Sequence, residues 1–186
     1  MHALSANITQ EEANNFIVIC HHNLEAVKQQ VAVTAAIVNV YNPKVNETAL
    51  GAAGHVGNHP IAEYLLENSA ELELAAAAML GMKDKVAEWL AKDSTLAESG
   101  GAHGISVAFH AAMSNDPEIM QMLLDNGAEE QVKNSLIGAV SKGHLKMTQW
   151  LLEHGADTSV QNYQGKSPLQ VAQDAGFTEV AELLKS

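Results

Sequence analysis

The sequence repeats one short pattern four times, and this repetition limits the fold more than any single motif does. The matching segments run over Thr48–Ala70, Ser106–Ala128 and Asn134–Asp157, and from Ser167 to the end of the chain. Each segment has a residue that can cap a helix, an apolar stretch, a Gly or Asn, and a second apolar stretch with paired leucines. This order predicts a helix, a tight turn and a second helix. Such a unit cannot bury its own apolar face, so we expect the units to stack.

Residue types mark the expected helix ends. Side chains of Ser, Thr and Asn accept hydrogen bonds from the free N–H groups of a first helical turn. We therefore expect caps at Thr48, Ser106, Asn134 and Ser167. A left-handed backbone costs Gly little and Asn not much. The helix breaks are accordingly expected at Gly57, Asn115, Gly143 and Gly176.

These residues resemble the ankyrin repeat, whose first helix opens on Thr-Pro-Leu-His and whose second ends in Leu-Leu and Gly-Ala. The last unit is the nearest match, with DTSVQNYQGKSPLQVA beginning at Asp157. The family's His is absent, so we expect the first helices to lack the family's His-to-cap hydrogen bond. Its positions hold Gly51, Phe109, Ile137 and Gln170. The resemblance covers roughly residues 14–186. It implies an all-α ankyrin repeat solenoid of about six helix-turn-helix units, and the runs ETALGAA, IAEYLL and AAAMLG resemble small stand-alone bacterial ankyrin repeat proteins.

The expected organisation is one domain over residues 10–186, after a disordered amino terminus over residues 1–9. Its units are expected at approximately 13–38, 48–70, 70–94, 106–128, 134–157 and 167–186. Successive break residues, starting at His22 and including Gly81, are separated by 35, 24, 34, 28 and 33 residues. The ankyrin period is about 33 residues. Two of the hairpins that link units, called fingers, are therefore shortened. The finger after Ala70 lacks nearly all of its residues, and the finger after Ala128 lacks about half.

The apolar run LAAAAML, at residues 74–80, then becomes the first helix of the third unit. The missing finger also removes the usual helix cap, and we expect Ser69 to replace it. Glu71 in the first turn would then interact favourably with the helix dipole. This predicts a helix from about Ala70 to Leu80. It also predicts a gap in the row of fingers, between residues 41–46 and residues 100–105.

Composition limits the partners. The net charge is −12, and all ten basic residues are Lys. Arg is the usual reader of phosphate and guanine, so nucleic acid and anionic membrane surfaces are poor partners. No apolar run approaches the roughly 18 residues of a membrane helix. Cys20 is the only cysteine, which excludes an intramolecular disulfide. We expect a cytoplasmic monomer that binds a basic or neutral protein.

The resemblance implies a non-enzymatic protein-binding module that uses the concave face formed by its fingers and inner helices. A stack of helix pairs presents such a face without an enclosed pocket. The candidate contact residues follow from their position in the repeat: Tyr41, Lys44, Asn46, Val56, Glu73, Leu80, His103, Ile105, His110, Lys142, Tyr163 and Lys166. Tyr41 and Tyr163 are the strongest candidates, because Tyr is enriched at interfaces.

The sequence is compatible with two other functions. Stacking could bring His21 or His22 toward His55 in a metal or small-ligand site, but no carboxylate or thiol has metal-ligand spacing to complete it. An unrecognised hydrolase could pair Ser106 with His110, four residues later, but Ser106 is needed as a helix cap. We therefore expect no catalytic residues, metal or cofactor.

Overall fold

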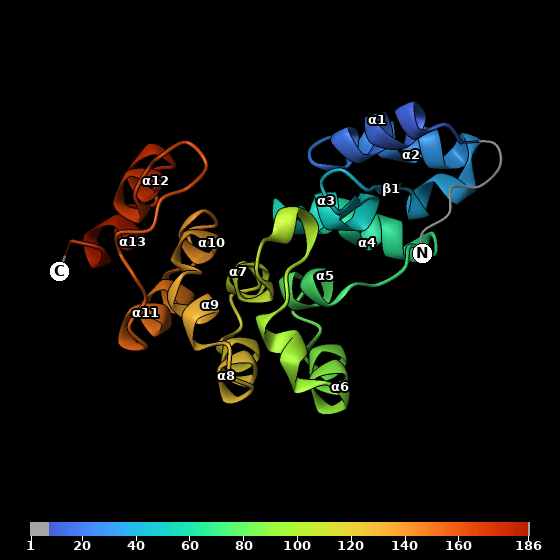
Figure 1. Cartoon of the computed structure of the whole chain (residues 1–186). Coiled ribbons are helices and arrows are strands. Elements are labelled where there is room, and N and C mark those ends of the chain that lie inside the picture. The colour runs from blue at the N-terminus through green and yellow to red at the C-terminus, as the bar shows by residue number, and fades with distance from the viewer. Residues whose placement is uncertain (1–7, 186) are drawn as a thin grey trace.

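The computed structural model describes residues 8–185, and the helices within that range form a curved stack of pairs (Figure 1). The first helix of each pair is an inner helix: α1 (Gln10–Cys20), α3 (Ala49–His55), α5 (Leu74–Met79), α7 (Val107–Ala112), α10 (Leu136–Val140) and α12 (Pro168–Asp174). The second is an outer helix: α2 (Leu24–Val33), α4 (His59–Glu67), α6 (Lys83–Lys92), α8 (Pro117–Asp125), α11 (Leu145–Glu153) and α13 (Thr178–Leu183). Consecutive inner helices pack on one another. The predicted all-α solenoid is confirmed.

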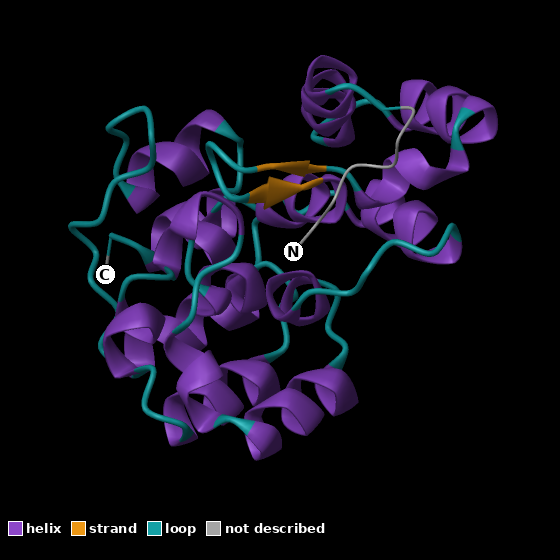
Figure 2. Ribbon diagram, turned by 45° about the vertical axis from the view of Figure 1, so that its right-hand side comes forward, coloured by secondary structure: helices purple, strands orange, loops and turns teal. Residues whose placement is uncertain are grey.

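Short elements connect the pairs. The first finger is a hairpin of β1 (Tyr41–Asn42) and β2 (Glu47–Thr48), the two strands drawn in Figure 2. The others are η1 (Ala35–Asn39), η2 (Ser94–Glu98), η3 (Ala102–Gly104) and α9 (Glu129–Lys133). Between residues 8 and 185 no helix has both the length and the apolar character needed to cross a bilayer.

The local helix signals act as the sequence indicates at three caps. Thr48, Ser106 and Ser167 each accept a hydrogen bond through the side-chain oxygen, from the backbone N–H three residues later. The breaks between paired helices are left-handed, with positive φ at Gly57, Gly81, Asn115, Gly143 and Gly176. Gly and Asn adopt this conformation most readily, which explains where α3, α5, α7, α10 and α12 end.

The disorder expected over residues 1–9 can be compared with the structure only from residue 8 onward. Residues 1–7 lie outside the described part of the chain. Disorder does not extend over the last two residues of the expected segment, 8 and 9. Ile8 is buried, and Thr9 forms a capping box with Glu12 at the start of α1. This reciprocal pair of hydrogen bonds satisfies two N–H groups at the beginning of the helix.

Alanine-rich α5 joins two apolar cores. Ala76 and Met79 pack with the amino-terminal core, whereas Ala75, Ala77 and Ala78 pack with the carboxy-terminal one. The helix thus has buried side chains on opposite sides, between α3 and α7. Small side chains let three inner helices approach closely. This packing explains the apolar run at residues 74–80.

The predicted start of α5 is wrong. Ser69 does not cap α5; it has a φ of 70° and ends the preceding helix α4. Residues 70–73 are not helical, and α5 begins at Leu74 without a side-chain cap. Asn39 fixes this segment instead, because its side chain donates to the Ser69 carbonyl at 2.9 Å and accepts from the Glu71 N–H at 2.8 Å. The cap prediction considered only neighbours in sequence.

Asn134 also differs from its prediction. It follows α9 and does not cap α10, which is preceded by Ser135 without a side-chain cap. The short junction after Ala128 forms α9 in place of a half-length finger. Turn hydrogen bonds continue from α9 into α10, from Ser135 N–H to Val132 and from Gly138 N–H to Ser135. Backbone carbonyls therefore supply the acceptors that a capping side chain would provide.

The expected gap between fingers is closed. The finger over residues 100–105 lies against the first finger, where the His103 N–H donates to the Val45 carbonyl at 3.1 Å. With no finger between them, these two hairpins become direct neighbours. Glu73 and Leu80 are both half-buried. The Glu73 carboxylate accepts from the Thr48 hydroxyl, and Leu80 packs against the amino-terminal core.

Candidate functional site

A groove of about 830 Å³ lies on the inner face of the stack. Inner helices and their ends form its floor through Val56, Phe109, Met113, Ile137 and Val171. The ends of α3 and α10, the α9–α10 junction and two fingers complete the lining: His55, His103, Ile105, Asn134, Ser141, Lys142, Val160, Gln161, Asn162 and Tyr163. The groove therefore joins residues from repeats that are distant in sequence. Its lining is mainly apolar with polar groups at the edge, as is usual for ligand sites.

Five of the predicted contact residues line this groove: Val56, His103, Ile105, Lys142 and Tyr163. Tyr163 is 94% exposed near the tip of the last finger, so its ring is available to a partner. The groove also includes Phe109 and Ile137, which were not among the predicted contacts. Both occupy the position of the family's His. That substitution was visible in the sequence as a signal of an unusual inner surface.

Lys142 has a structural partner within the groove. Its ammonium group donates to the carbonyl oxygens of Val56 at 2.6 Å and of Gly57 at 3.3 Å. These carbonyls lie just after α3. Burial lowers the pKa of Lys142, because the charged form loses part of its hydration. The side chain spans from the end of α10 to the end of α3, along one edge of the groove.

The other predicted contacts lie outside the groove. Lys44 and Asn46 are exposed on the first finger, and the Tyr41 hydroxyl donates to Asn46 Oδ1 at 2.9 Å. Lys166 forms an ion pair with Asp174 at 2.7 Å. The half-buried Glu73 and Leu80 are also absent from its lining. Whether these residues contact a partner stays a prediction.

The sequence led us to expect His110 to be exposed on the inner face, but its side chain is buried. It is 1% exposed, and its Nδ1 lies 2.8 Å from the Ser106 carbonyl oxygen. Its Nε2 is buried and has no hydrogen-bond partner among the described residues. Burial is the main cause that lowers the pKa of His110, to about 4. Since Nδ1 meets the backbone and Ser106 Oγ accepts from Phe109 N–H, the imidazole and hydroxyl do not form the pair that a hydrolase would need.

Four ionisable side chains meet where the first two fingers touch. Glu47 Oε1 lies 3.3 Å from His21 Nε2, 3.2 Å from His55 Nδ1 and 3.1 Å from His103 Nε2. We call these four residues the histidine–glutamate cluster. Glu47 is 4% exposed, on β2; His21 follows α1, His55 ends α3 and His103 belongs to η3. All four ligand atoms lie within 4.8 Å of one another.

The sequence anticipated only part of this cluster. From the sequence we expected His21 or His22 to lie near His55, but no carboxylate had the spacing to complete a site. His22 is exposed and stays outside the cluster, while Glu47 and His103 complete it. Their 56-residue separation gives no recognisable spacing. They meet because the missing finger lets the finger over residues 100–105 lie against the first one.

The charges within the cluster are coupled. Burial opposes ionisation of Glu47, but the interactions with His21, His55 and His103 outweigh it, lowering the pKa of Glu47 to about 2. The interaction with the nearby Glu47 carboxylate raises the pKa of His21, against the effect of burial. Glu47 is therefore a carboxylate at neutral pH, and the imidazoles around it interact with a buried negative charge.

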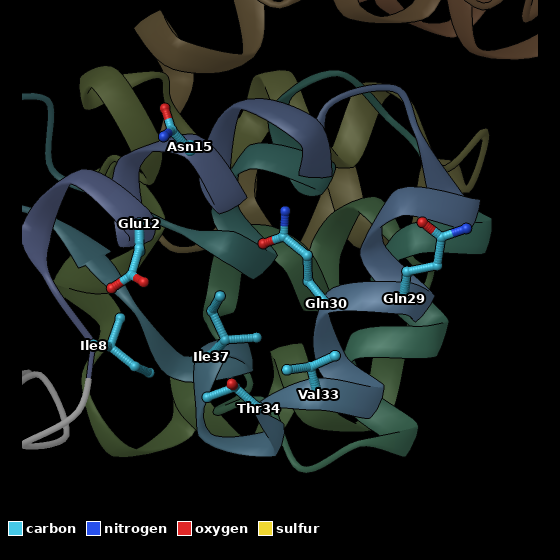
Figure 3. A pocket seen from close by; sticks show the side chains of 8 residues that line it. All are labelled: Ile8, Glu12, Asn15, Gln29, Gln30, Val33, Thr34 and Ile37. Atoms are coloured by element: carbon cyan, nitrogen blue, oxygen red, sulfur yellow. The ribbon is translucent and has the colours of Figure 1, made fainter.

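A second hollow of about 430 Å³ lies on the first helix pair (Figure 3). Its lining comes from α1, α2, η1 and the adjoining residues: Ile8, Glu12, Asn15, Gln29, Gln30, Val33, Thr34 and Ile37. Glu12 is the charged group of this set, and its carboxylate is already engaged by Thr9. The hollow has no convergent set of groups comparable to the groove or the histidine–glutamate cluster.

Comparisons with known proteins agree with this architecture. The family model described as ankyrin repeats (3 copies) matches residues 74–162 and 108–186, together more than half of the chain. An E3 ubiquitin-protein ligase of Arabidopsis thaliana, KEG, is 31% identical over 78 residues, which is 39% of this chain and 5% of that protein. The chain thus corresponds to a small part of this curated relative.

A solved structure gives a match over nearly the whole chain. It is the Bd0816 predatory endopeptidase from Bdellovibrio bacteriovorus in complex with immunity protein Bd3460. The TM-score is 0.51 and the identity is 24%, over 91% of this chain and 96% of the matched chain. At this identity the likeness shows the fold alone.

Proposed function

The chain belongs to the ankyrin repeat family, and from this we propose that it is a non-enzymatic module whose inner groove binds a segment of a protein partner. The observation that carries the proposal is the groove itself. Its lining joins an apolar floor to the exposed ring of Tyr163, in a family whose members bind proteins. Buried apolar centres with aromatic residues near them are typical of protein interfaces.

The chemistry of the groove indicates the kind of segment that would fit. Phe109, Met113 and Ile137 offer apolar surface, while Asn134 and Asn162 offer hydrogen-bonding groups. A partner loop with one or two apolar side chains, flanked by polar backbone, would match this pattern. The net charge of −12 attracts a basic partner over long range, is indifferent to a neutral one and repels an acidic one. A chain of similar fold occurs in a complex of an endopeptidase and an immunity protein, which fits a role in holding one protein.

Quantitative capture from a lysate of the source organism tests the groove. Wild-type protein would be immobilised beside Tyr163→Ala and Ile105→Ala, both in the groove lining. Val18→Ala is the control, because Val18 is 57% exposed on α1 and lies outside the groove. We expect both groove variants to retain at least about tenfold less of the partner, since truncating a side chain that a partner buries at the centre of an interface costs roughly 2 kcal/mol. Equal retention by all four proteins would show that the groove is not the binding site.

The first finger can be tested in the same way. Tyr41→Ala removes a tyrosine that lies outside the groove. A loss of partner in this variant would extend the interface to the first finger, as the sequence analysis expects. Circular dichroism of each variant would confirm that the helices remain folded.

A further inference from the structure

We propose that His21, Glu47, His55 and His103 bind one divalent transition-metal ion, Zn²⁺ in the first instance, in a closed four-ligand site. Two of these residues, His55 and His103, also line the groove, but the inference does not depend on protein binding. Its basis is that three imidazole nitrogens and one carboxylate oxygen converge on one point from different parts of the chain.

The geometry is close to that of a coordination shell. Ligand atoms about 2.05 Å from a tetrahedral zinc ion are about 3.35 Å apart. Glu47 Oε1 already lies 3.1–3.3 Å from a nitrogen of His21, His55 and His103. The longest separation within the cluster, up to 4.8 Å, would have to shorten by about 1.4 Å to reach tetrahedral spacing. Side-chain rotations would have to supply this movement, and His103 is the least restrained of the three histidines, because its side chain is 41% exposed on a finger.

Contacts behind the ligands support the assignment. His21 Nδ1 lies 3.0 Å from the Ile17 carbonyl oxygen and 3.1 Å from the Val18 carbonyl oxygen. A carbonyl can only accept, so Nδ1 carries a proton, and in the neutral form of the ring Nε2 presents its lone pair to Glu47. Metal-binding histidines are held in this way, with the second ring nitrogen donating to a backbone carbonyl. A lone pair facing a carboxylate oxygen needs a proton or a cation between them.

His55 provides an independent observation. Its Nδ1 is buried and, among the described residues, lacks a hydrogen bond, although it lies 3.2 Å from Glu47 Oε1. The pair is thus close but not in hydrogen-bond geometry. A buried nitrogen without a partner is costly. A metal ion between this nitrogen and the carboxylate would satisfy both.

The ligand types select the metal. Imidazole suits Zn²⁺, Cu²⁺ and Ni²⁺, whereas Ca²⁺ and Mg²⁺ prefer oxygen ligands. Cys20 is buried, outside the cluster, and burial is the main cause that raises the pKa of its thiol. It therefore stays protonated and does not compete as a ligand. Four protein ligands with no open position indicate a structural role.

Such an ion would fasten three elements together. His21 belongs to the first helix pair, Glu47 and His55 to the first finger and α3, and His103 to the next finger. The left-handed backbone of His103, with a φ of 56°, aims its ring at Glu47. The ion would fix the amino-terminal unit against the fingers that border the groove.

Zinc titration tests the proposal directly. The whole chain would be stripped with a chelator, dialysed, and titrated with Zn²⁺ by calorimetry, with elemental analysis after desalting. We expect one equivalent of zinc and a higher Tm of the loaded protein. Co²⁺ should give the intense visible absorption of a tetrahedral centre. His103→Ala is the main variant, because its exposed side chain can be removed without opening the core, and we expect it to weaken zinc binding by about 100-fold.

The matched control is His22→Ala, which removes an exposed histidine next to His21 but outside the cluster. It should bind zinc as the wild type does. Glu47→Gln, checked for folding by circular dichroism, should also weaken zinc binding. Three results would each overturn the proposal: less than about a tenth of an equivalent bound to the wild type, unchanged affinity in His103→Ala, or an equal loss in His22→Ala. If the wild type binds less zinc than this, the four residues form a polar cluster that holds no metal ion.

Discussion

The ammonium group of Lys142 donates to the carbonyl oxygen of Val56, 86 residues earlier in the chain, at 2.6 Å. The bond connects the end of α10 with the end of α3, two inner helices separated by α5 and α7. It satisfies a carbonyl that has no partner within α3, since the last carbonyls of a helix lie beyond its own hydrogen bonding. The side chain of Lys142 thus links two non-adjacent inner helices beside the groove.

Removing this bond should destabilise the fold. In Lys142→Met the aliphatic part of the side chain remains, but the carbonyls of Val56 and Gly57 lose a charged donor. We expect the free energy of unfolding to fall by about 1–2 kcal/mol. Urea denaturation would measure it. Lys146→Met is the control, because Lys146 is exposed on α11, and it should change stability by less than about 0.5 kcal/mol. Equal effects of the two substitutions would show that the hydrogen bonds of Lys142 do not stabilise the fold.

Gly57 should tolerate substitution less well than another left-handed glycine. A Cβ at Gly57 would lie 2.4 Å from Lys142 Cε, whereas one at Gly176 would meet nothing within 4 Å. Both have positive φ, 62° and 74°, so Ala costs about 1 kcal/mol at either for backbone reasons. We expect Gly57→Ala to cost more than Gly176→Ala, because Lys142 must also move. Thermal unfolding of the two variants would measure the difference, and equal Tm values would refute the close contact.

The fingerless junction should depend on Asn39. Its side chain bonds to both the Ser69 carbonyl and the Glu71 N–H. Asn39→Ala should cost about 1 kcal/mol and speed hydrogen exchange at the Glu71 amide, since both bonds are lost. Asn15→Ala is the control, at an exposed asparagine of α1. Unchanged exchange at Glu71 in Asn39→Ala would show that this segment is held by other contacts.

Stability should depend on pH through His110. The pKa of His110 is lowered to about 4, mainly by burial and further by the nearby charge of His55, while the unfolded chain titrates near 6.5. Between these values the unfolded state binds more protons. The contribution of His110 is therefore complete above pH 6.5 and is lost as pH falls toward 4, by roughly 3 kcal/mol.

The comparison with His110→Gln isolates this effect, because the variant lacks the titrating group but keeps a polar side chain. Urea denaturation from pH 7.5 to 4 would be measured in the presence of a chelator, so that metal binding does not contribute. We expect the wild type to lose more stability than the variant across this range. Parallel pH profiles would mean that His110 is hydrated in the folded protein.

The sequence by itself determined the repeating helix pairs. Caps such as Ser106 and breaks such as Gly57 and Asn115 act within one or two helical turns, so their effect can be recognised without knowing the rest of the fold. The apolar run of α5 was assigned correctly for the same reason. The groove was also partly foreseen, because position within a repeat decides which side chains, Tyr163 among them, lie on the inner face.

The tertiary structure alone decided contacts between residues far apart in sequence. Asn39, not Ser69, fixes the fingerless junction, because its partners lie about 30 residues away. Glu47 and His103 meet only when a missing finger brings their hairpins together. Hydrogen bonds, burial and charge act over a few ångströms in space, whatever the separation along the chain. Stacking of the units sets those distances, and no local spacing in the sequence records them.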